Sequence, residues 1–417
     1  MSSPYRVGVV GGGWRAQFFL RLAATLTESF ELVGVAARRP EARERLTDAY
    51  GVPAYETAGE LVRGAAPDFV VVSVSAESNA AVTAEVVAAG AKALAETPPA
   101  PTMDGLRRMW ADLRAPERVQ VAEQYLLMPG HAARLAAVRR GVIGEPTSVH
   151  VSSTHGYHAV SLIRGLLGVG EEPAVIRATR HEAPLVDPLT RSGWTDDPQP
   201  RTAANTIATL DFGDRLGLYD FTDNQWHNRL RHRRILIRGT RGEIENDSVL
   251  RMTGPRKIVT SSLVRSHLGH DLNLDGFETE GIHLDGEFLF ENPFLGHRLM
   301  DEEIAMASLM AATGEWAADR APAPYPLREA IHDAVLGLAI DEAAATARAS
   351  ARRSTDGAAR TSIRSVGCSD VSRGRRCGSS PTARRSEPRV APSMQPARYH
   401  ANRVRSVVPV RRRGEPS

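Results

Sequence analysis

The segment VGVVGGGWRAQFF contains a glycine pattern whose spacing suits the binding of phosphates. Gly11, Gly13 and Ala16 follow the spacing G-x-G-x-x-A between a short apolar run and a segment of helical periodicity. The first glycine permits a tight turn, the second lets a diphosphate approach the backbone, and the small third residue lets the helix pack on the sheet. The pattern predicts a dinucleotide site that also includes Trp14 and Arg15. A glycine-rich turn without a ligand is the alternative.

Two adjacent arginines follow the second apolar run, ELVGVAA (31–37). Sites for NAD usually have Asp or Glu at this place, where the carboxylate accepts the ribose 2′-hydroxyl. Arg38 and Arg39 instead suit a 2′-phosphate, so we expect a preference for NADP, with NAD as the other candidate. Solvated arginines at the start of a helix are the alternative. Ser73 and Ser75, after the next apolar run, are also expected to contact the cofactor.

The elements that must position these residues alternate between strands and helices, which predicts a parallel sheet covered by helices. Strands are expected at 6–10, 31–37, 68–74 and 91–95, and helices at 14–27, 40–50 and 77–89. Ligands in such sheets bind beyond the carboxyl ends of the strands. The segment Glu96-Thr97-Pro98 follows a strand directly and therefore belongs to that edge.

The pattern changes after VQVAEQY (119–125), where a helix at 129–140 is followed by longer alternating strands. This alternation indicates a mixed or antiparallel sheet with one covered face, closed by helices at 301–312 and 327–347. The expected strands are PTSVHVSS (146–153), TIATLDF (206–212), LGLYDF (216–221) and RRILIRG (233–239), and the pattern ends near GEIEN (242–246). We therefore predict three parts, with bounds 1–124, 125–347 and 348–417.

The last part differs from the rest in charge and composition. From Arg348 to Ser417 there are 17 arginines and 4 acidic residues, whereas residues 1–347 carry 35 basic and 45 acidic side chains. Both cysteines, Cys368 and Cys377, lie in this tail. Sparse apolar residues without periodicity predict a disordered tail, and a shifted reading frame is a hypothesis for its origin.

The acidic charge of residues 1–347 gives no sign of a surface for nucleic acid. No stretch reaches about 18 consecutive apolar residues, which is the length that a membrane helix needs. The opening MSSPYRVGVV has no signal-peptide pattern. We therefore expect a cytoplasmic protein that binds neither nucleic acid nor membranes.

Several segments together resemble the Gfo/Idh/MocA family, named for glucose–fructose oxidoreductase, inositol dehydrogenase and a rhizopine-catabolism protein. The resemblance covers residues 5 to about 347. It depends on GGGWRA, ETP, QYLLMPGHAARLAAVRRGVIGEP, HGYHAVSLIRGLLG and ILIRGTRGEIE. It implies an α/β protein with an N-terminal Rossmann domain and a C-terminal α/β domain that has a large open sheet. It also implies an NAD(P)-dependent oxidoreductase of sugars, polyols or related compounds that assembles as a dimer or tetramer.

The family generally has Glu-Lys-Pro where this chain has Glu96-Thr97-Pro98. By this resemblance Glu96 lies beside the nicotinamide ribose and the middle residue faces the substrate. The family lysine binds the reacting oxygen and assists its proton transfer. Thr97 can donate or accept a hydrogen bond but does not titrate near neutral pH.

The family also has an Asp-x-x-x-His pattern at the start of a helix, which here reads Thr154-His155-Gly156-Tyr157-His158. The histidine is kept at His158 and the aspartate is absent. Histidine suits a general base because its unperturbed pKa is about 6.5. We therefore predict His158 as the base, with Thr97 and Tyr157 as the other catalytic residues.

The remaining candidates line the expected cleft between the two domains. Gln124 begins the crossing and is expected to contact the cofactor, while His155 is expected to bind substrate hydroxyls. Trp226 and His227 follow a strand and are either substrate contacts or part of an exposed loop. The leading interpretation is an NAD(P)-dependent oxidoreductase acting on CH–OH groups. The alternative is a dinucleotide-binding sensor that has lost the chemistry, which Thr97 favours.

Two further patterns do not predict a metal site. His155 and His158 lack nearby cysteine or carboxylate partners in the sequence. DLNLDG (271–276) begins like a calcium loop, but Ile282 stands where that loop needs a bidentate glutamate. We expect no metal.

Overall fold

The predicted alternation of strands and helices forms a parallel sheet at the start of the chain. The computed structural model describes residues 3–190, 193–269 and 278–358. Its first sheet has the order β3-β2-β1-β4-β5-β6. The strands are β1 (Tyr5–Val10), β2 (Phe30–Ala36), β3 (Ala54–Tyr55), β4 (Phe69–Val72), β5 (Lys92–Ala95) and β6 (Val119–Val121). The strand order reverses between β1 and β4, and ligands of such sheets bind at that point.

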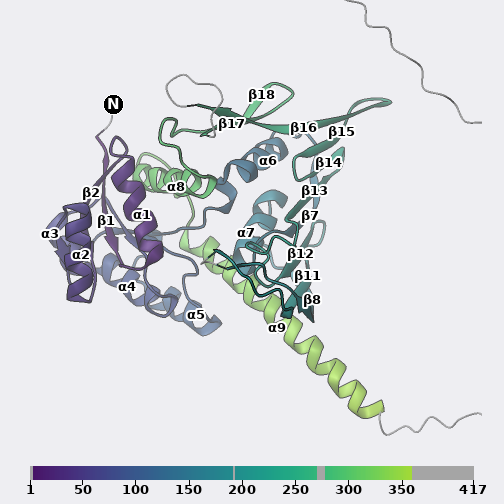
Figure 1. Ribbon diagram of the computed structural model, residues 1–417, viewed down its shortest axis with the longest axis horizontal. Coiled ribbons are helices and arrows are strands. Elements are labelled where there is room, and N and C mark those ends of the chain that lie inside the picture. The colour runs from purple at the N-terminus through teal and green to yellow at the C-terminus, as the bar shows by residue number, and fades with distance from the viewer. Residues whose placement is uncertain (1–2, 191–192, 270–277, 359–417) are drawn as a thin grey trace, which may run out of the picture. The chain divides into compact units, whose positions relative to one another are not determined.

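Helices cover both faces of this sheet (Figure 1). They are α1 (Trp14–Thr25), α2 (Pro40–Tyr50), α3 (Ala58–Ala65), α4 (Ala76–Ala88) and α5 (Met103–Asp112). The late helix α8 (Asp301–Ala317) packs beside α1, so that Ile304 and Met310 share a core with Phe19. A helix from late in the sequence thus completes the core around the first sheet.

A second sheet of ten strands contains most of the other described strands, in the order β18-β17-β16-β15-β14-β13-β7-β12-β11-β8. Its neighbours are antiparallel except for the parallel pair β7 and β12. The strands are β7 (Pro146–Ser152), β8 (Val175–Leu185), β11 (Arg201–Asp211), β12 (Leu216–Thr222), β13 (Arg234–Gly239), β14 (Gly242–Glu245), β15 (Ser248–Gly254), β16 (Lys257–Leu268), β17 (Glu278–Leu284) and β18 (Glu287–Glu291).

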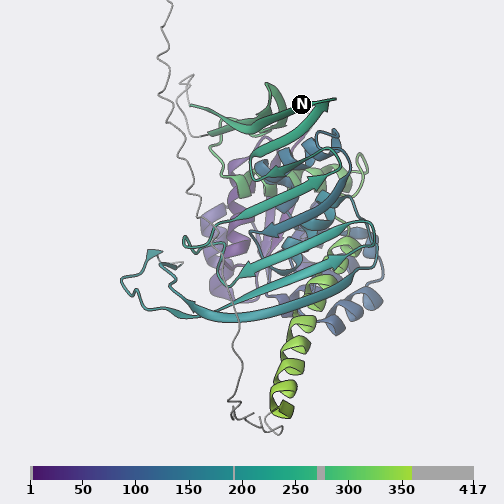
Figure 2. The ribbon, with the colours of Figure 1, turned by 90° about the vertical axis from the view of Figure 1, so that its right-hand side faces the viewer.

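Helices α6 (Pro129–Arg139), α7 (Gly156–Leu167) and α9 (Leu327–Ala358) lie behind this sheet in Figure 2. They form one core with the sheet, in which Leu162, Ile237 and Ile340 are buried. Apolar side chains of this sheet such as Ile207 in β11 and Leu250 in β15 are exposed in the described chain. The predicted α/β class, with a parallel sheet followed by a large mixed sheet, is confirmed.

The structure differs from the sequence prediction at several strands. No strand was predicted beyond residue 246, yet β15 to β18 continue the sheet. The prediction also omitted β8 and the short pair β9 (Leu189–Thr190) and β10 (Gly193–Trp194). Burial along β8 and β16 is irregular, and most of their residues are at least partly exposed. Such strands lack the regular alternation of buried and exposed residues on which the prediction of a strand depends.

Helix α9 continues to Ala358, past the predicted start of the tail at residue 348, and the predicted bounds of the tail stay a prediction. The segment DEAAATARASARR is rich in alanine and arginine, which favour helix. The remainder of the tail, with Cys368 and Cys377, and the DLNLDG segment lie outside the described residues. The predicted domain boundary after residue 124 stays a prediction. That boundary lies between β6 and a short 3-10 helix, Tyr125–Leu127.

A buried ion-pair network joins α7 to α9. Arg164 lies 2.6 Å from a carboxylate oxygen of Asp333 and 2.6 Å from one of Glu329. The Arg164 and Asp333 side chains are 4% and 3% exposed. Because these two charges are buried away from water, removing one of them would leave the other without the partner that stabilises it.

We expect Arg164→Leu to lower the free energy of unfolding by about 3–5 kcal/mol, because it leaves Asp333 buried and unpaired. Urea unfolding measures the loss. Arg201→Ala is the control, since Arg201 is paired with Asp197 on the surface, where solvent screens the ion pair, and its loss should be much smaller. Equal losses in the two variants would contradict the structural role given to Arg164.

Candidate active site

A cavity of about 1350 Å³ opens at the carboxyl ends of β1, β2, β4 and β5 and reaches the start of α7. Every residue predicted for the site lines it. These residues are Gly11, Gly13, Trp14, Arg15, Ala16, Arg38, Arg39, Ser73, Ser75, Glu96, Thr97, Gln124, His155, Tyr157, His158, Trp226 and His227. Their individual roles stay predictions.

The glycine turn between β1 and α1 leaves room for a ligand. Gly11 has a φ of 133°, and a Cβ there would lie 2.0 Å from the Ser73 carbonyl oxygen. A Cβ on Gly13 would have no atom within 4 Å. Helix α1 also begins without a side-chain cap and without an acidic residue in its first turn. This helix start therefore suits an anionic phosphate, and the residues fit a dinucleotide.

The two arginines after β2 occupy the far end of the cavity. Arg38 and Arg39 are both exposed and line it, and Arg39 is the N-cap residue of α2. Arg43 holds the turn by donating to the carbonyl oxygens of Ala37 and Arg38, each at 2.9 Å. Glu56 lines the same end. Arg38 and Arg39 thus line the cavity, and a contact with a 2′-phosphate stays a prediction.

Arg15 forms ion pairs with two carboxylates that are distant in the sequence. Its guanidinium contacts Glu96 and lies 2.7 Å from Glu302, and its Cζ atom is 4.9 Å from the centre of the Phe18 ring. Burial lowers the pKa of Arg15, but Glu96 and Glu302 more than reverse this, so the pKa lies above its ordinary value. Its positive charge is thus shared between Glu96 and Glu302, which the sequence motif alone did not indicate.

The Glu96-Thr97-Pro98 segment is held from both sides. The Thr97 amide and hydroxyl donate to the Glu96 carboxylate at 2.7 and 3.2 Å. The buried Asn79 of α4 donates to the carbonyl oxygens of Glu96 and Pro98 at 2.6 and 3.1 Å. The peptide bond between Thr97 and Pro98 is cis. The hydrogen bonds from Asn79 and from the Thr97 amide fix the backbone around Thr97 at the wall of the cavity.

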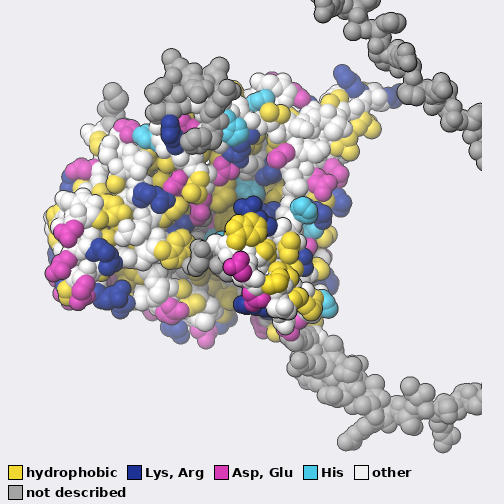
Figure 3. Space-filling model, viewed as in Figure 1, with side chains coloured by type: hydrophobic (Ala, Val, Ile, Leu, Met, Phe, Trp, Pro, Cys, Tyr) yellow, Lys and Arg dark blue, Asp and Glu magenta, His cyan; other side chains and the backbone are white. Residues whose placement is uncertain are grey.

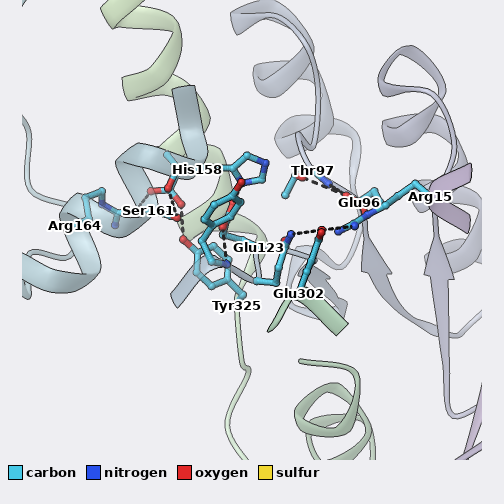
Figure 4. A network of polar contacts seen from close by, with 12 residues as sticks. Arg15, Glu96, Thr97, Glu123, His158, Ser161, Arg164, Glu302 and Tyr325 are labelled. Atoms are coloured by element: carbon cyan, nitrogen blue, oxygen red, sulfur yellow. Dashed lines mark hydrogen bonds and ion pairs between the residues drawn. The ribbon is translucent and has the colours of Figure 1, made fainter. Parts of the chain in front are cut away.

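The predicted base, His158, has a buried carboxylate partner. Its Nδ1 atom lies 2.6 Å from Glu123, and the two side chains are 11% and 2% exposed. Figure 4 shows this contact, with Thr97 on the opposite side of the site. Sequence analysis missed Glu123, although its place two residues beyond β6 put it at the ligand-binding edge of the sheet.

Aromatic side chains surround the imidazoles of this region. The His158 ring lies 4.3 Å from the centre of Tyr157, and Trp226 stacks on Phe221 at 5.1 Å and lies 4.9 Å from His155. Burial lowers the pKa of His155 to about 4, helped by His158 and opposed by Glu123, so His155 is neutral near pH 7. Burial raises the pKa of the Tyr157 hydroxyl, which stays protonated and able to donate.

Gln124 and Glu302 are hydrogen-bonded to each other in the wall of the cavity. The Gln124 Nε2 atom donates to Glu302 at 3.1 Å, whereas its Oε1 atom is buried without a hydrogen-bond partner in the described structure. An acceptor of this kind on the cavity wall suits a ligand N–H group, such as that of a carboxamide. Sequence analysis missed Glu302, which comes from the first turn of α8.

A family model matches the first part of the chain. Residues 5–124 match the family model GFO_IDH_MocA, described as "Oxidoreductase family, NAD-binding Rossmann fold". Residues 5–124 belong to the Gfo/Idh/MocA family. The recognition made from the glycine turn and the ETP segment is thereby confirmed. No curated protein sequence matches the chain.

Solved structures with a similar fold extend the likeness beyond the matched Gfo/Idh/MocA region. An oxidoreductase from Agrobacterium radiobacter, in complex with NAD+, L-tartaric acid and magnesium, has a TM-score of 0.59 at 16% identity. It is similar over 82% of this chain and 96% of that chain. Levoglucosan dehydrogenase with NADH and levoglucosan has a TM-score of 0.58 at 17% identity, over 82% and 98% of the chains. Biliverdin reductase from Synechocystis, with biliverdin and NADP+, has a TM-score of 0.52 at 15% identity, over 82% and 99%.

Metal sites and membrane-spanning helices are the two other features considered for the described residues. No group of three His, Cys, Asp or Glu side chains in residues 3–190, 193–269 and 278–358 is placed to hold a metal ion. Within the same ranges, no helix combines the length and the apolar character that crossing a membrane requires. Basic and acidic side chains are interspersed on the face seen in Figure 3.

Proposed function

We propose that this protein is an NADP-preferring oxidoreductase that transfers hydride between the nicotinamide and a sugar, polyol or related hydroxy or carbonyl compound. The observation that supports this most is that one cavity contains both the glycine turn and the cluster of Thr97, Tyr157 and His158. Two of the similar structures hold small hydroxy compounds, L-tartaric acid and levoglucosan. The third holds biliverdin, so the fold alone does not select the substrate.

In the oxidative direction, His158 accepts the proton of the substrate hydroxyl while the carbon loses a hydride and its C–O bond becomes a carbonyl. When bound, the oxidised nicotinamide supplies the acceptor for that hydride. The protonated Tyr157 donates a hydrogen bond to the same oxygen, and Thr97 does so once its hydroxyl turns from the Glu96 carboxylate to the substrate. Reduction of a carbonyl is the reverse, with the proton returning from His158.

The charges around this end of the cavity support an uncharged substrate. Glu96, Glu302 and Glu123 lie there, and Arg15 offsets part of their charge through its two ion pairs. An anionic substrate would meet carboxylates without a free cation on the described wall near Thr97. The rings of Trp226 and Tyr157 offer apolar surface to the C–H face of a sugar or polyol ring.

The test is to mix the purified protein with NADP or NAD and a panel of sugars, inositols and open-chain polyols, and to follow nicotinamide absorbance. A change in absorbance with an uncharged member of the panel supports the proposal. NADP binding by calorimetry with no turnover across the panel would favour the alternative, a dinucleotide-binding sensor, which the absent lysine suggests. The expected cytoplasmic location and the dimer or tetramer depend on the family resemblance and stay predictions.

We expect the double variant Arg38→Ala/Arg39→Ala to weaken NADP binding by at least about 10- to 100-fold, because even one charge-assisted bond to a phosphate contributes about 1.5–3 kcal/mol. NAD binding should change less than about threefold. Calorimetric titration with both cofactors measures the difference. Arg45→Ala, an exposed arginine of α2 outside the cavity wall, is the control. An equal loss for NAD and NADP would contradict the 2′-phosphate assignment.

A further inference from the structure

Glu123 is a buried carboxylate with two fixed contacts. Its Oε1 atom accepts the backbone N–H of Tyr125 at 3.2 Å, and its Oε2 atom lies 2.6 Å from His158 Nδ1. The Glu123 side chain is 2% exposed. The backbone amide fixes the orientation of the carboxylate, so that one of its oxygens is held for the imidazole.

We propose that Glu123 is a positioning residue, which fixes the tautomer and the ring orientation of His158 for proton transfer. This inference rests on the proposed function, because it gives His158 the role of the base. No residue of the sequence motifs supplies this carboxylate, and Glu123 is 35 positions away from His158.

The chemistry of the contact determines the tautomer. An ionised carboxylate only accepts hydrogen bonds, so His158 Nδ1 must carry the hydrogen and the neutral ring has its lone pair on Nε2. The substrate hydroxyl proton then moves to Nε2, and the carboxylate stabilises the imidazolium that forms. The Nδ1 hydrogen stays on Nδ1, and the proton returns from Nε2 in the reverse reaction.

Packing restricts the ring to this orientation. The His158 imidazole lies between Tyr125, at 4.5 Å between ring centres, and Tyr157, at 4.3 Å. Ser161 donates to the His158 carbonyl oxygen at 2.9 Å and so fixes the backbone as well. The neighbouring ring of His155, 5.3 Å away, is neutral near pH 7 and does not compete as a cation.

A different residue stands where the family pattern has its aspartate. Thr154 is 1% exposed, and its hydroxyl forms no hydrogen bond to His158 in the described part of the chain. It therefore does not orient His158. Glu123 supplies a carboxylate to the same histidine from the segment after β6, in a separate part of the sequence.

The first test reads the tautomer directly in the wild-type protein. The ¹⁵N chemical shifts of the His158 ring, assigned by their loss in His158→Gln, distinguish a hydrogen on Nδ1 from one on Nε2. We expect the Nδ1–H form and a low-field Nδ1–H proton resonance. The Nε2–H form would overturn the proposal, and this measurement requires no Glu123 variant to fold.

The second test separates positioning from a purely structural role. We expect Glu123→Gln to lower kcat by about 10²–10⁴-fold, as in triads whose orienting carboxylate is replaced, with KM and NADP affinity within about threefold. The low-field resonance should disappear. Glu278→Gln is the matched control, because Glu278 is also a buried carboxylate that accepts backbone amides, those of Gly296 and Arg298, and lies outside the cavity wall.

The outcomes separate this inference from the proposed function. A folded Glu123→Gln protein with kcat within about threefold of the wild type overturns the positioning role, as does an unchanged low-field resonance. If the wild-type protein turns over no substrate, the proposed function fails. Loss of the resonance in Glu123→Gln would then still support the control of the His158 tautomer by Glu123.

Discussion

His158→Gln should abolish turnover, with a loss of at least about 10²–10⁴-fold in kcat, while NADP binds as in the wild type. Removing a positioned general base leaves the substrate hydroxyl without an acceptor for its proton. Three neighbouring side chains do not replace it as a base: Thr97 does not titrate near neutral pH, the pKa of Tyr157 is raised, and burial lowers that of His155 to about 4. The carboxamide of glutamine can donate to Glu123 and so keeps the buried carboxylate satisfied.

The control for this substitution is His150→Gln, in β7 and outside the cavity wall, which should keep its activity. Turnover is measured by nicotinamide absorbance and cofactor binding by calorimetry. Undiminished turnover in His158→Gln would show that another group takes the proton. Loss of NADP binding together with turnover would instead assign His158 a part in holding the cofactor.

The convergence of the predicted residues on one cavity has a simple physical reason. Parallel strands place their carboxyl ends at one edge of the sheet, so residues that follow strands must meet there. Gly11, Ser73 and Thr97 each follow a strand of the first sheet. Gly11 was predicted from the glycine pattern, Ser73 from its place after an apolar run, and Thr97 from its place together with the family resemblance. Periodicity and local motif are enough for such residues.

The groups that sequence reasoning missed are defined by tertiary contacts. Glu302 pairs with Arg15 across 287 positions, and Glu123 contacts His158 across 35. Neither carboxylate belongs to a local motif. Glu302 reaches Arg15 only because α8 packs beside α1, and Glu123 reaches His158 only because the end of β6 lies near the start of α7. The missed strands β15 to β18 have a related cause. Their burial depends on neighbours in a sheet with one exposed face, so β16 lacks a regular two-residue pattern.

The other large effect is expected at the glycine turn, where Gly13→Val should lower NADP affinity by about 10- to 100-fold without unfolding the protein. Gly13 has a φ of −78°, which any residue adopts, and a Cβ there would have no atom within 4 Å. The added methyl groups would instead occupy the space at the start of α1 where the diphosphate is expected. Calorimetry measures the affinity and urea unfolding measures the stability.

Substitutions at two further glycines distinguish an effect on NADP affinity from an effect on the stability of the fold. Gly254→Val is the control, since a Cβ there also meets no atom within 4 Å but lies outside the cavity wall. Gly11→Ala should mainly destabilise the fold, because its φ of 133° strains an alanine and its Cβ would lie 2.0 Å from the Ser73 carbonyl oxygen. NADP affinity of Gly13→Val equal to that of Gly254→Val would mean that the diphosphate binds elsewhere. The enzymatic and the sensing interpretations both require it at the N-terminus of α1.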